Sequence, residues 1–119
     1  MTFRDTLPTG KALNQDDQVV SNSGRYQLIL QRDGNLVLYD LSAGQKVLWA
    51  SGTTGQATNQ CIMQTDGNFV LYDLSAGQKA LWASGTAGHP NSYLRVQDDG
   101  NLAIYQPSDP IWATNTVQS

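Results

Sequence analysis

Apolar and polar positions alternate on both sides of an Asp-Gly pair that occurs three times along the chain. Around the first pair the apolar residues take even positions and the remaining set takes odd ones: Leu28, Leu30, Leu36 and Leu38, against Gln31, Val37 and Tyr39. Side chains of a strand alternate between its two faces, so this pattern predicts a β-hairpin with one core face and one face bearing Gln and Tyr. An odd-length turn keeps each set on its face, and we expect a three-residue Asp-Gly-Asn turn with a bulge.

The hairpin is one copy of an internal repeat. The copies are Gln31-Arg-Asp-Gly-Asn-Leu-Val-Leu-Tyr39, Gln64-Thr-Asp-Gly-Asn-Phe-Val-Leu-Tyr72 and Gln97-Asp-Asp-Gly-Asn-Leu-Ala-Ile-Tyr105, with starts 33 residues apart. A Trp-containing strand follows each copy, and the third copy lacks three residues of the loop before it. Each repeat is too small to fold alone, so the three must share a core.

The second and third copies test the hairpin assignment. Their core-face positions should again be apolar, and they are Cys61, Met63, Phe69 and Leu71, then Leu94, Val96, Leu102 and Ile104. The sequence therefore predicts an all-β fold in which these side chains are buried.

Composition narrows the class of protein. The 119 residues suit one domain spanning 1–119. A net charge of -3 without a run of Lys or Arg argues against a nucleic-acid partner. No apolar stretch could span a membrane and no export signal follows Met1, so we expect a soluble protein, cytoplasmic as written or secreted by a route not visible here.

Cys61 is the single cysteine, which excludes an internal disulfide. No His and Cys cluster has the spacing of a metal site, so we expect no metal and no cofactor. By its parity Cys61 belongs to the core, where a thiol is inert.

The polar face repeats Gln, Asp, Asn and Tyr at fixed offsets in all three copies. A carboxylate accepts hydrogen bonds, an amide both donates and accepts, and a phenol does either, which together suit a vicinal diol such as that of a sugar. The competing interpretation is that Asp and Asn only satisfy the turn backbone while Tyr covers the sheet edge.

These residues resemble the signature of the monocot mannose-binding lectins, Gln-x-Asp-x-Asn-x-Val-x-Tyr. The first two copies match it at every specified position, and the third departs only at Ala103. The resemblance implies a β-prism II of three four-stranded antiparallel sheets with pseudo-threefold symmetry. It also implies that Trp49, Trp82 and Trp112 pack near the centre and that the protein binds sugar without catalysis.

The resemblance further implies which residues hold mannose: Asp and Asn the O2 hydroxyl, Gln the O3, Tyr the O4, and Val the ring carbons. Carried over, the sites are Gln31, Asp33, Asn35, Val37 and Tyr39; Gln64, Asp66, Asn68, Val70 and Tyr72; and Gln97, Asp99, Asn101 and Tyr105. Ala103 removes apolar contact and Arg95 replaces the Ile of the other copies, so we expect the third site to be the weakest.

Mannose-containing glycans or glycoproteins are the partners that the resemblance implies, together with a homodimer formed by exchanging the C-terminal strand around Trp112 to Val117. One carboxylate and one amide per turn are too few ligands for calcium, so we expect calcium-independent binding. An enzyme is disfavoured because His89 is the only His, there is no Glu, and the Asp residues are spread one per repeat. A scaffold for protein contacts and a β-trefoil remain the alternatives.

Overall fold

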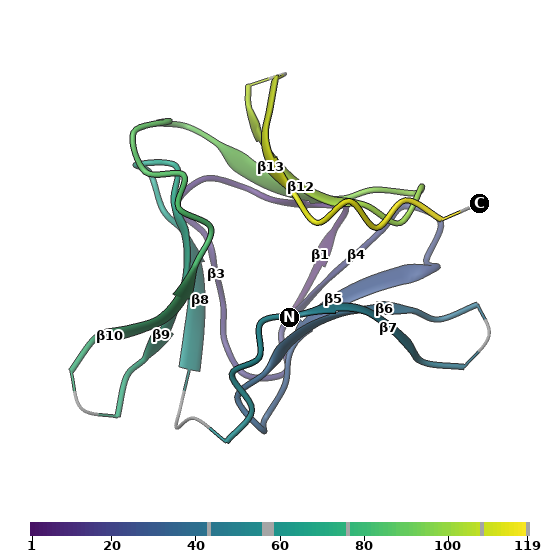
Figure 1. The fold of residues 1–119 in the computed structure, drawn as a ribbon, viewed down its shortest axis with the longest axis horizontal. Coiled ribbons are helices and arrows are strands. Elements are labelled where there is room, and N and C mark those ends of the chain that lie inside the picture. The colour runs from purple at the N-terminus through teal and green to yellow at the C-terminus, as the bar shows by residue number, and fades with distance from the viewer. Residues whose placement is uncertain (43, 56–58, 76, 108, 119) are drawn as a thin grey trace.

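The computed structural model describes residues 1–42, 44–55, 59–75, 77–107 and 109–118, and these form strands and turns only. Among them no helix is long and apolar enough to cross a membrane. The strands build three sheets set around a central axis, one sheet for each repeat (Figure 1). The all-β prediction is confirmed.

Each repeat contributes three antiparallel strands to its own sheet. The first sheet contains β5 (Tyr26–Leu30), β6 (Leu36–Asp40) and β7 (Lys46–Ala50). The second contains β8 (Asn59–Met63), β9 (Phe69–Asp73) and β10 (Lys79–Ala83). The third contains β11 (Tyr93–Val96), β12 (Leu102–Gln106) and β13 (Asp109–Ala113).

A fourth strand of each sheet comes from the first twenty residues of the chain. β2 (Thr6–Leu7) pairs with β11, β3 (Ala12–Leu13) with β8, and β4 (Gln18–Val20) with β5. The chain thus visits all three sheets in six-residue steps, and each step buries one side chain completely, at Leu7, Leu13 and Val19. The six-residue spacing of these apolar side chains is the sequence signal for the three N-terminal strands that join the sheets. The pattern of the hairpins does not contain this signal.

The first sheet departs from the expected four antiparallel strands. β1 (Thr2–Arg4) lies parallel to β4, with Phe3 opposite Val19, so this sheet has five strands and one parallel pair. The other two sheets are four-stranded and antiparallel, as expected. Without β1, β4 would be the edge strand of this sheet, and the N–H and C=O groups on its outer side would have no partner strand. β1 pairs with these groups.

The predicted core faces are confirmed. All twelve side chains have zero exposure: Leu28, Leu30, Leu36, Leu38, Cys61, Met63, Phe69, Leu71, Leu94, Val96, Leu102 and Ile104. Burial raises the pKa of the Cys61 thiol well above its usual value, as expected for an inert core cysteine. Trp49, Trp82 and Trp112 pack edge to face, with ring centroids 5.2, 5.9 and 5.7 Å apart, which confirms the central Trp cluster.

The turn is odd-numbered as predicted, but it lies one residue earlier. Leu30 is paired with Leu36, and the N–H of Gln31 donates to the carbonyl of Asn35 at 2.9 Å. The three turn residues are therefore Arg32, Asp33 and Gly34, not Asp-Gly-Asn. The reason is that the last turn position requires positive φ, and Gly34 provides it at 93°.

Candidate functional site

Each predicted group of residues comes together at the end of one hairpin. In the first sheet Gln31 follows β5, Asp33 lies in the turn, Asn35 precedes β6, and Val37 and Tyr39 lie on β6. The Asp side chains of the three groups are exposed, whereas the Gln, Asn and Tyr side chains are half-buried. The three groups lie on three different sheets, so the structure brings together the members of each group but not the groups themselves.

Gln and Tyr are hydrogen-bonded to each other in every copy: Gln31 to Tyr39, Gln64 to Tyr72 and Gln97 to Tyr105. In the first copy the Gln31 carboxamide satisfies both of its neighbours when its oxygen accepts from the Tyr39 hydroxyl. Its nitrogen then donates to Asp33, 3.2 Å from each carboxylate oxygen. Tyr, Gln and Asp thus form one chain of polar contacts across the outer face of the hairpin.

The Asp side chain also stabilises its own turn. Asp33 Oδ1 accepts from the N–H of Asn35 at 2.9 Å, and Asp66 and Asp99 accept in the same way from Asn68 and Asn101. The turn-stabilising interpretation is therefore correct for one oxygen of each carboxylate. Because that oxygen holds the turn, the exposed carboxylate stays in one orientation.

The Asn carboxamide is fixed through its oxygen. Asn35 Oδ1 accepts from Ser51 Oγ at 3.0 Å, from the N–H of Gly52 at 3.1 Å and from the N–H of Thr53 at 3.3 Å. Thr53 Oγ1 in turn donates to the carbonyl of Gly34 at 2.6 Å and pairs with Ser51 Oγ at 2.7 Å. The oxygen of Asn35 is thus occupied, whereas none of the hydrogen bonds among the described residues uses its carboxamide nitrogen, which is available to donate.

The hydroxyl residues that hold Asn were missed by the sequence reasoning. They are Ser51 and Thr53, Ser84 and Thr86, and Thr114 and Thr116, and the second and third pairs bond to Asn68 and Asn101. The sequence does contain a signal for them, because a Ser or Thr, one further residue and a Thr follow the Trp-Ala pair in every repeat.

Val lies beneath the polar groups rather than beside them. Val37 is 2% exposed and Val70 is 3% exposed, while Ala103 of the third copy is fully buried. A ligand could touch only the edge of either Val side chain, so most of the apolar contact at these positions is made within the protein.

The third group has different surroundings. Arg95 pairs with Asp5, with Nε 3.2 Å from Oδ2, on the strand where the other copies have Ile29 and Ile62. Asn115, with φ of 59°, occupies the position that glycine takes in the other two copies. Polar geometry around Gln97 and Tyr105 is nevertheless kept.

The arrangement supplies an exposed carboxylate that accepts, an amide nitrogen that donates, and a phenol oxygen that accepts. A hydroxyl group both donates and accepts, so neighbouring hydroxyls on one molecule match this set. Within the described residues no three His, Cys, Asp or Glu side chains gather as metal ligands.

A scan against family models finds no match for the sequence, and a search of curated proteins finds none either. Solved structures do match. A monomeric monocot mannose-binding lectin from Gastrodia elata is 42% identical, with a TM-score of 0.84 over 96% of this chain and 99% of that chain.

The mannose-specific agglutinin of snowdrop (Galanthus nivalis), solved with methyl-α-D-mannoside, is 38% identical, with a TM-score of 0.74 over 97% of this chain and 99% of its own. A lectin from Allium sativum is 43% identical, with a TM-score of 0.74 over 92% of this chain and 98% of its own.

Fold and comparisons together define a lectin of the β-prism II class, a kind of protein that binds carbohydrate without catalysing its conversion. Identity above 30% over nearly the full length of both chains then places this one within that class: it belongs to the monocot mannose-binding lectin family.

Proposed function

We propose that this lectin binds mannose at three sites, one at each Gln-x-Asp-x-Asn-x-Val-x-Tyr hairpin. The observation that supports this most strongly is the threefold recurrence of one geometry: an exposed Asp, a Gln bonded to Tyr, and an Asn whose oxygen is occupied and whose nitrogen is left to donate. The ligand of the snowdrop agglutinin is a mannoside, which agrees with this assignment.

At each site we assign the carboxylate of Asp and the nitrogen of Asn to the O2 hydroxyl of mannose. Gln is assigned to O3 and Tyr to O4, with Val at the edge of the ring. The axial O2 of mannose would meet an acceptor and a donor at once. Galactose has an equatorial O2 and an axial O4, so its hydroxyls would miss these partners.

The critical experiment replaces Asp33, Asp66 and Asp99 by Asn together. Asn keeps an oxygen that can accept from the turn N–H, but it removes the charge and presents a donor where the sugar needs an acceptor. Titration with methyl α-mannoside should show affinity at least about tenfold lower than wild type, a loss of roughly 1.4 kcal/mol.

Asp109→Asn is the matched control, because Asp109 is an exposed carboxylate on β13 outside the three groups. Its affinity for mannoside should equal that of wild type, and circular dichroism should show that both variants are folded. A folded triple variant that still binds mannoside at wild-type strength would refute the assignment.

Three sites on one domain of residues 1–119 would make the protein multivalent toward mannose-rich glycans. A shallow site for one sugar gives a Kd of about 1 mM, and clustered glycans gain through effective concentration. Since each turn offers one carboxylate, binding should be independent of calcium and survive EDTA.

A homodimer formed by exchange of the C-terminal strand stays a proposal. In the single chain β13 pairs with its own β12, and Thr116 Oγ1 donates to the carbonyl of Gly100 at 2.7 Å. Exchange would replace these contacts with the same ones from a partner. Sedimentation at micromolar concentration tests it, and a monomer at all concentrations would exclude it.

A further inference from the structure

Each motif tyrosine has one neighbour directly across its hairpin, on the outer face of its sheet. Tyr39 is paired with Gln27, Tyr72 with Gln60, and Tyr105 with Tyr93. Residues that face each other in an antiparallel pair project to the same side, with Cβ atoms about 4.5–5.5 Å apart. The neighbour of the tyrosine is therefore a glutamine at the first two sites and a second tyrosine at the third.

The two neighbouring glutamines are held by residues outside the motif. Gln27 Nε2 donates to Gln18, whose own Nε2 donates to Thr2 Oγ1 at 3.0 Å. Gln60 Nε2 donates to Asn14 Oδ1 at 3.0 Å. Among the described residues neither glutamine is hydrogen-bonded to the tyrosine beside it, so neither fixes the position of that tyrosine.

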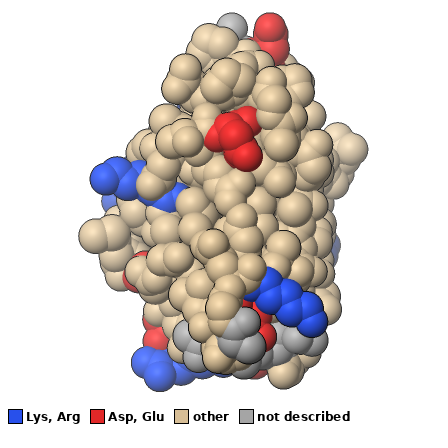
Figure 2. Space-filling model, turned by 90° about the vertical axis from the view of Figure 1, so that its left-hand side faces the viewer, with Lys and Arg blue, Asp and Glu red and all other residues tan. Residues whose placement is uncertain are grey.

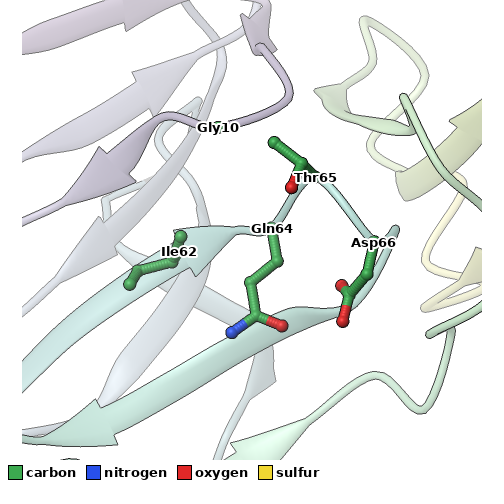
Figure 3. Close-up of a pocket in the computed structure, with 5 residues that line it drawn as sticks. All are labelled: Gly10, Ile62, Gln64, Thr65 and Asp66. Atoms are coloured by element: carbon green, nitrogen blue, oxygen red, sulfur yellow. The ribbon is translucent and has the colours of Figure 1, made fainter.

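The second site shows how the tyrosine is fixed without help from its neighbour. The carboxamide of Gln64 extends toward β9, the strand that carries Tyr72, and is hydrogen-bonded to the Tyr72 hydroxyl (Figure 3). On the side of the molecule that carries the second sheet, charged side chains are few and separated (Figure 2). The second site is therefore a reference in which the motif glutamine alone fixes the hydroxyl and the surroundings add little charge.

At the third site an aromatic stack adds to this hydrogen bond. The rings of Tyr93 and Tyr105 are stacked, with centroids 5.9 Å apart and 23° between their planes, and Gln97 is bonded to the Tyr105 hydroxyl as in the other copies. Both tyrosines are half-buried. Offset stacking stabilises a pair of rings beyond the area that they bury. The Tyr105 ring is therefore held on the side where Tyr39 and Tyr72 have only a glutamine with other partners.

Tyr105 has less support from its own strand than its counterparts have. The side chain two positions earlier lies on the same face, roughly 7 Å away. It is Ala103 at the third site, whereas it is Val37 at the first and Val70 at the second. The smaller alanine leaves more room beside the ring, so the stack on the neighbouring strand matters more at the third site.

We propose that Tyr93 is a positioning residue of the third site: its ring holds Tyr105 so that the phenol hydroxyl meets the O4 hydroxyl of mannose. This inference rests on the proposed mannose function, in which the motif tyrosine is assigned to O4. Tyr93 acts through Tyr105, and the third site thus makes the same O4 contact as the other two with a different support.

The experiment uses full-length proteins with one intact site. Asp33→Asn with Asp66→Asn leaves the third site, and Asp33→Asn with Asp99→Asn leaves the second. Each is titrated with methyl α-mannoside and with methyl 4-deoxy-α-mannoside, which lacks the O4 hydroxyl. The ratio of the two affinities measures the contact at O4 and should be at least about threefold at each site, as expected for the loss of one hydrogen bond.

Two substitutions at Tyr93 separate positioning from a general effect on the fold. Tyr93→Phe keeps the ring and should keep the affinity ratio of the third-site protein. Tyr93→Gln introduces the residue of the other two sites, but Pro8 stands where the second sheet has Asn14, so the new side chain has no polar partner there. Tyr93→Gln should lower the ratio to about one by weakening only the binding of methyl mannoside.

Gln60→Ala in the second-site protein is the matched control, because Gln60 is the counterpart of Tyr93 and is not bonded to Tyr72. Its affinity ratio should equal that of the unchanged second-site protein. Circular dichroism should show that all variants are folded. A loss of stability without a change in the ratio would mean that Tyr93 serves the fold alone, and the proposal would be wrong.

Failure of the positioning role can be told apart from failure of the proposed function. Absence of methyl mannoside binding in the wild-type chain would overturn both. Binding at the second site alone, or a third-site ratio that is about one before any change at Tyr93, would overturn the positioning role and leave the function standing. An equal loss of the ratio in Tyr93→Phe would also overturn it, because the ring is proposed to act and not its hydroxyl.

Discussion

The second and third repeats carry the same four polar residues, yet they close their turns differently. At the second turn the carbonyl of Asp66 accepts from the N–H groups of Gly88 and His89, at 2.9 and 3.0 Å. At the third turn the carbonyl of Asp99 accepts from the N–H of Gln118 at 2.5 Å. Thr86 is 6% exposed, whereas its counterpart Thr116 is half-buried.

This difference shows that the motif is only part of the proposed binding site. In the proposal Gln, Asp, Asn and Tyr supply the chemical groups, but the segment that packs over the turn also contacts the turn and limits its movement. We call this segment the cover: it includes Thr86, Gly88 and His89 at the second turn, and Thr116 and Gln118 at the third. Because the two covers differ, the same substitution should change stability by different amounts at the two turns.

The largest effect is expected for glycine to alanine at the two turns. At Gly67, with φ of 95°, a Cβ would lie 2.1 Å from the backbone oxygen of His89. At Gly100 the nearest atoms are the side-chain Cγ of Gln118, at 2.8 Å, and the backbone oxygen of Thr116, at 2.9 Å, so the overlap is much smaller than at Gly67. Gly67→Ala should lower the free energy of unfolding by more than about 3 kcal/mol, and Gly100→Ala by less.

Gly85→Ala is the control for that pair. Gly85 has φ of 74° but no atom within 4 Å of an added Cβ, so the substitution adds backbone strain alone, about 1–2 kcal/mol. Urea unfolding of the three variants gives the ranking. Equal losses at Gly67 and Gly85 would mean that the cover over the second turn yields easily.

The next largest loss of stability is expected when the threonine that contacts each turn is replaced by valine. Thr86 Oγ1 donates to the carbonyl of Gly67 at 2.6 Å, and Thr116 Oγ1 donates to that of Gly100 at 2.7 Å. Valine keeps the shape and removes the hydroxyl, which leaves a buried acceptor without its partner. We expect a loss of about 2 kcal/mol for Thr86→Val and about 1 kcal/mol for the more exposed Thr116→Val, from thermal unfolding.

Each valine variant should also weaken mannoside binding at its own site, because the hydroxyl pair positions Asn68 or Asn101. Titration of proteins with a single intact site would show this. A larger loss of stability for Thr116→Val than for Thr86→Val would reverse the comparison.

A smaller effect on stability, which depends on pH, is expected in the first repeat and not in the third. Asp40 accepts from Arg25 Nε at 3.1 Å and from Nη2 at 3.0 Å, whereas the third repeat has the neutral Gln106 at this position. The hydrogen bonds from Arg25 hold the pKa of Asp40 well below its unfolded value of about 3.9. The stabilisation is therefore complete above about pH 4 and is lost as the pH falls further toward the folded pKa.

Asp40→Asn should consequently lower the melting temperature at pH 7, and the gap to wild type should narrow below about pH 4. Asp109→Asn, at an exposed position, should show almost no gap at either pH. A gap for Asp40→Asn that does not depend on pH would mean that packing, and not charge, accounts for it.

The smallest effect, a change in mannoside affinity, is expected for the valine that lies beneath the proposed sugar position. Val70 is 3% exposed, so Val70→Ala should weaken methyl mannoside binding at the second site by only about twofold, or roughly 0.4 kcal/mol. The third site should nevertheless remain the weakest of the three, as its Ala103 and Arg95 predict. Titration of single-site proteins checks both points, and a tightest third site would contradict the ranking.

The sequence by itself determined the repeat, the hairpins and the two faces of each. Alternation of side chains is a local property of any strand, so Leu28 and Gln31 could be assigned to opposite faces without knowing what covers them. The exact turn was harder to assign, because Asp33, Gly34 and Asn35 all suit turns and the pairing across the hairpin decided which were used.

Only the tertiary structure decided what surrounds each motif. The strands that complete the sheets come from residues far away in sequence, as when β2 pairs with β11 and brings Asp5 to Arg95. Ser51 and Thr53 reach Asn35 because β7 pairs with β6 within one repeat. The alternation of side chains shows which face of a strand is buried, but it does not show which strands lie side by side, so these contacts follow only from the strand pairing of the whole fold.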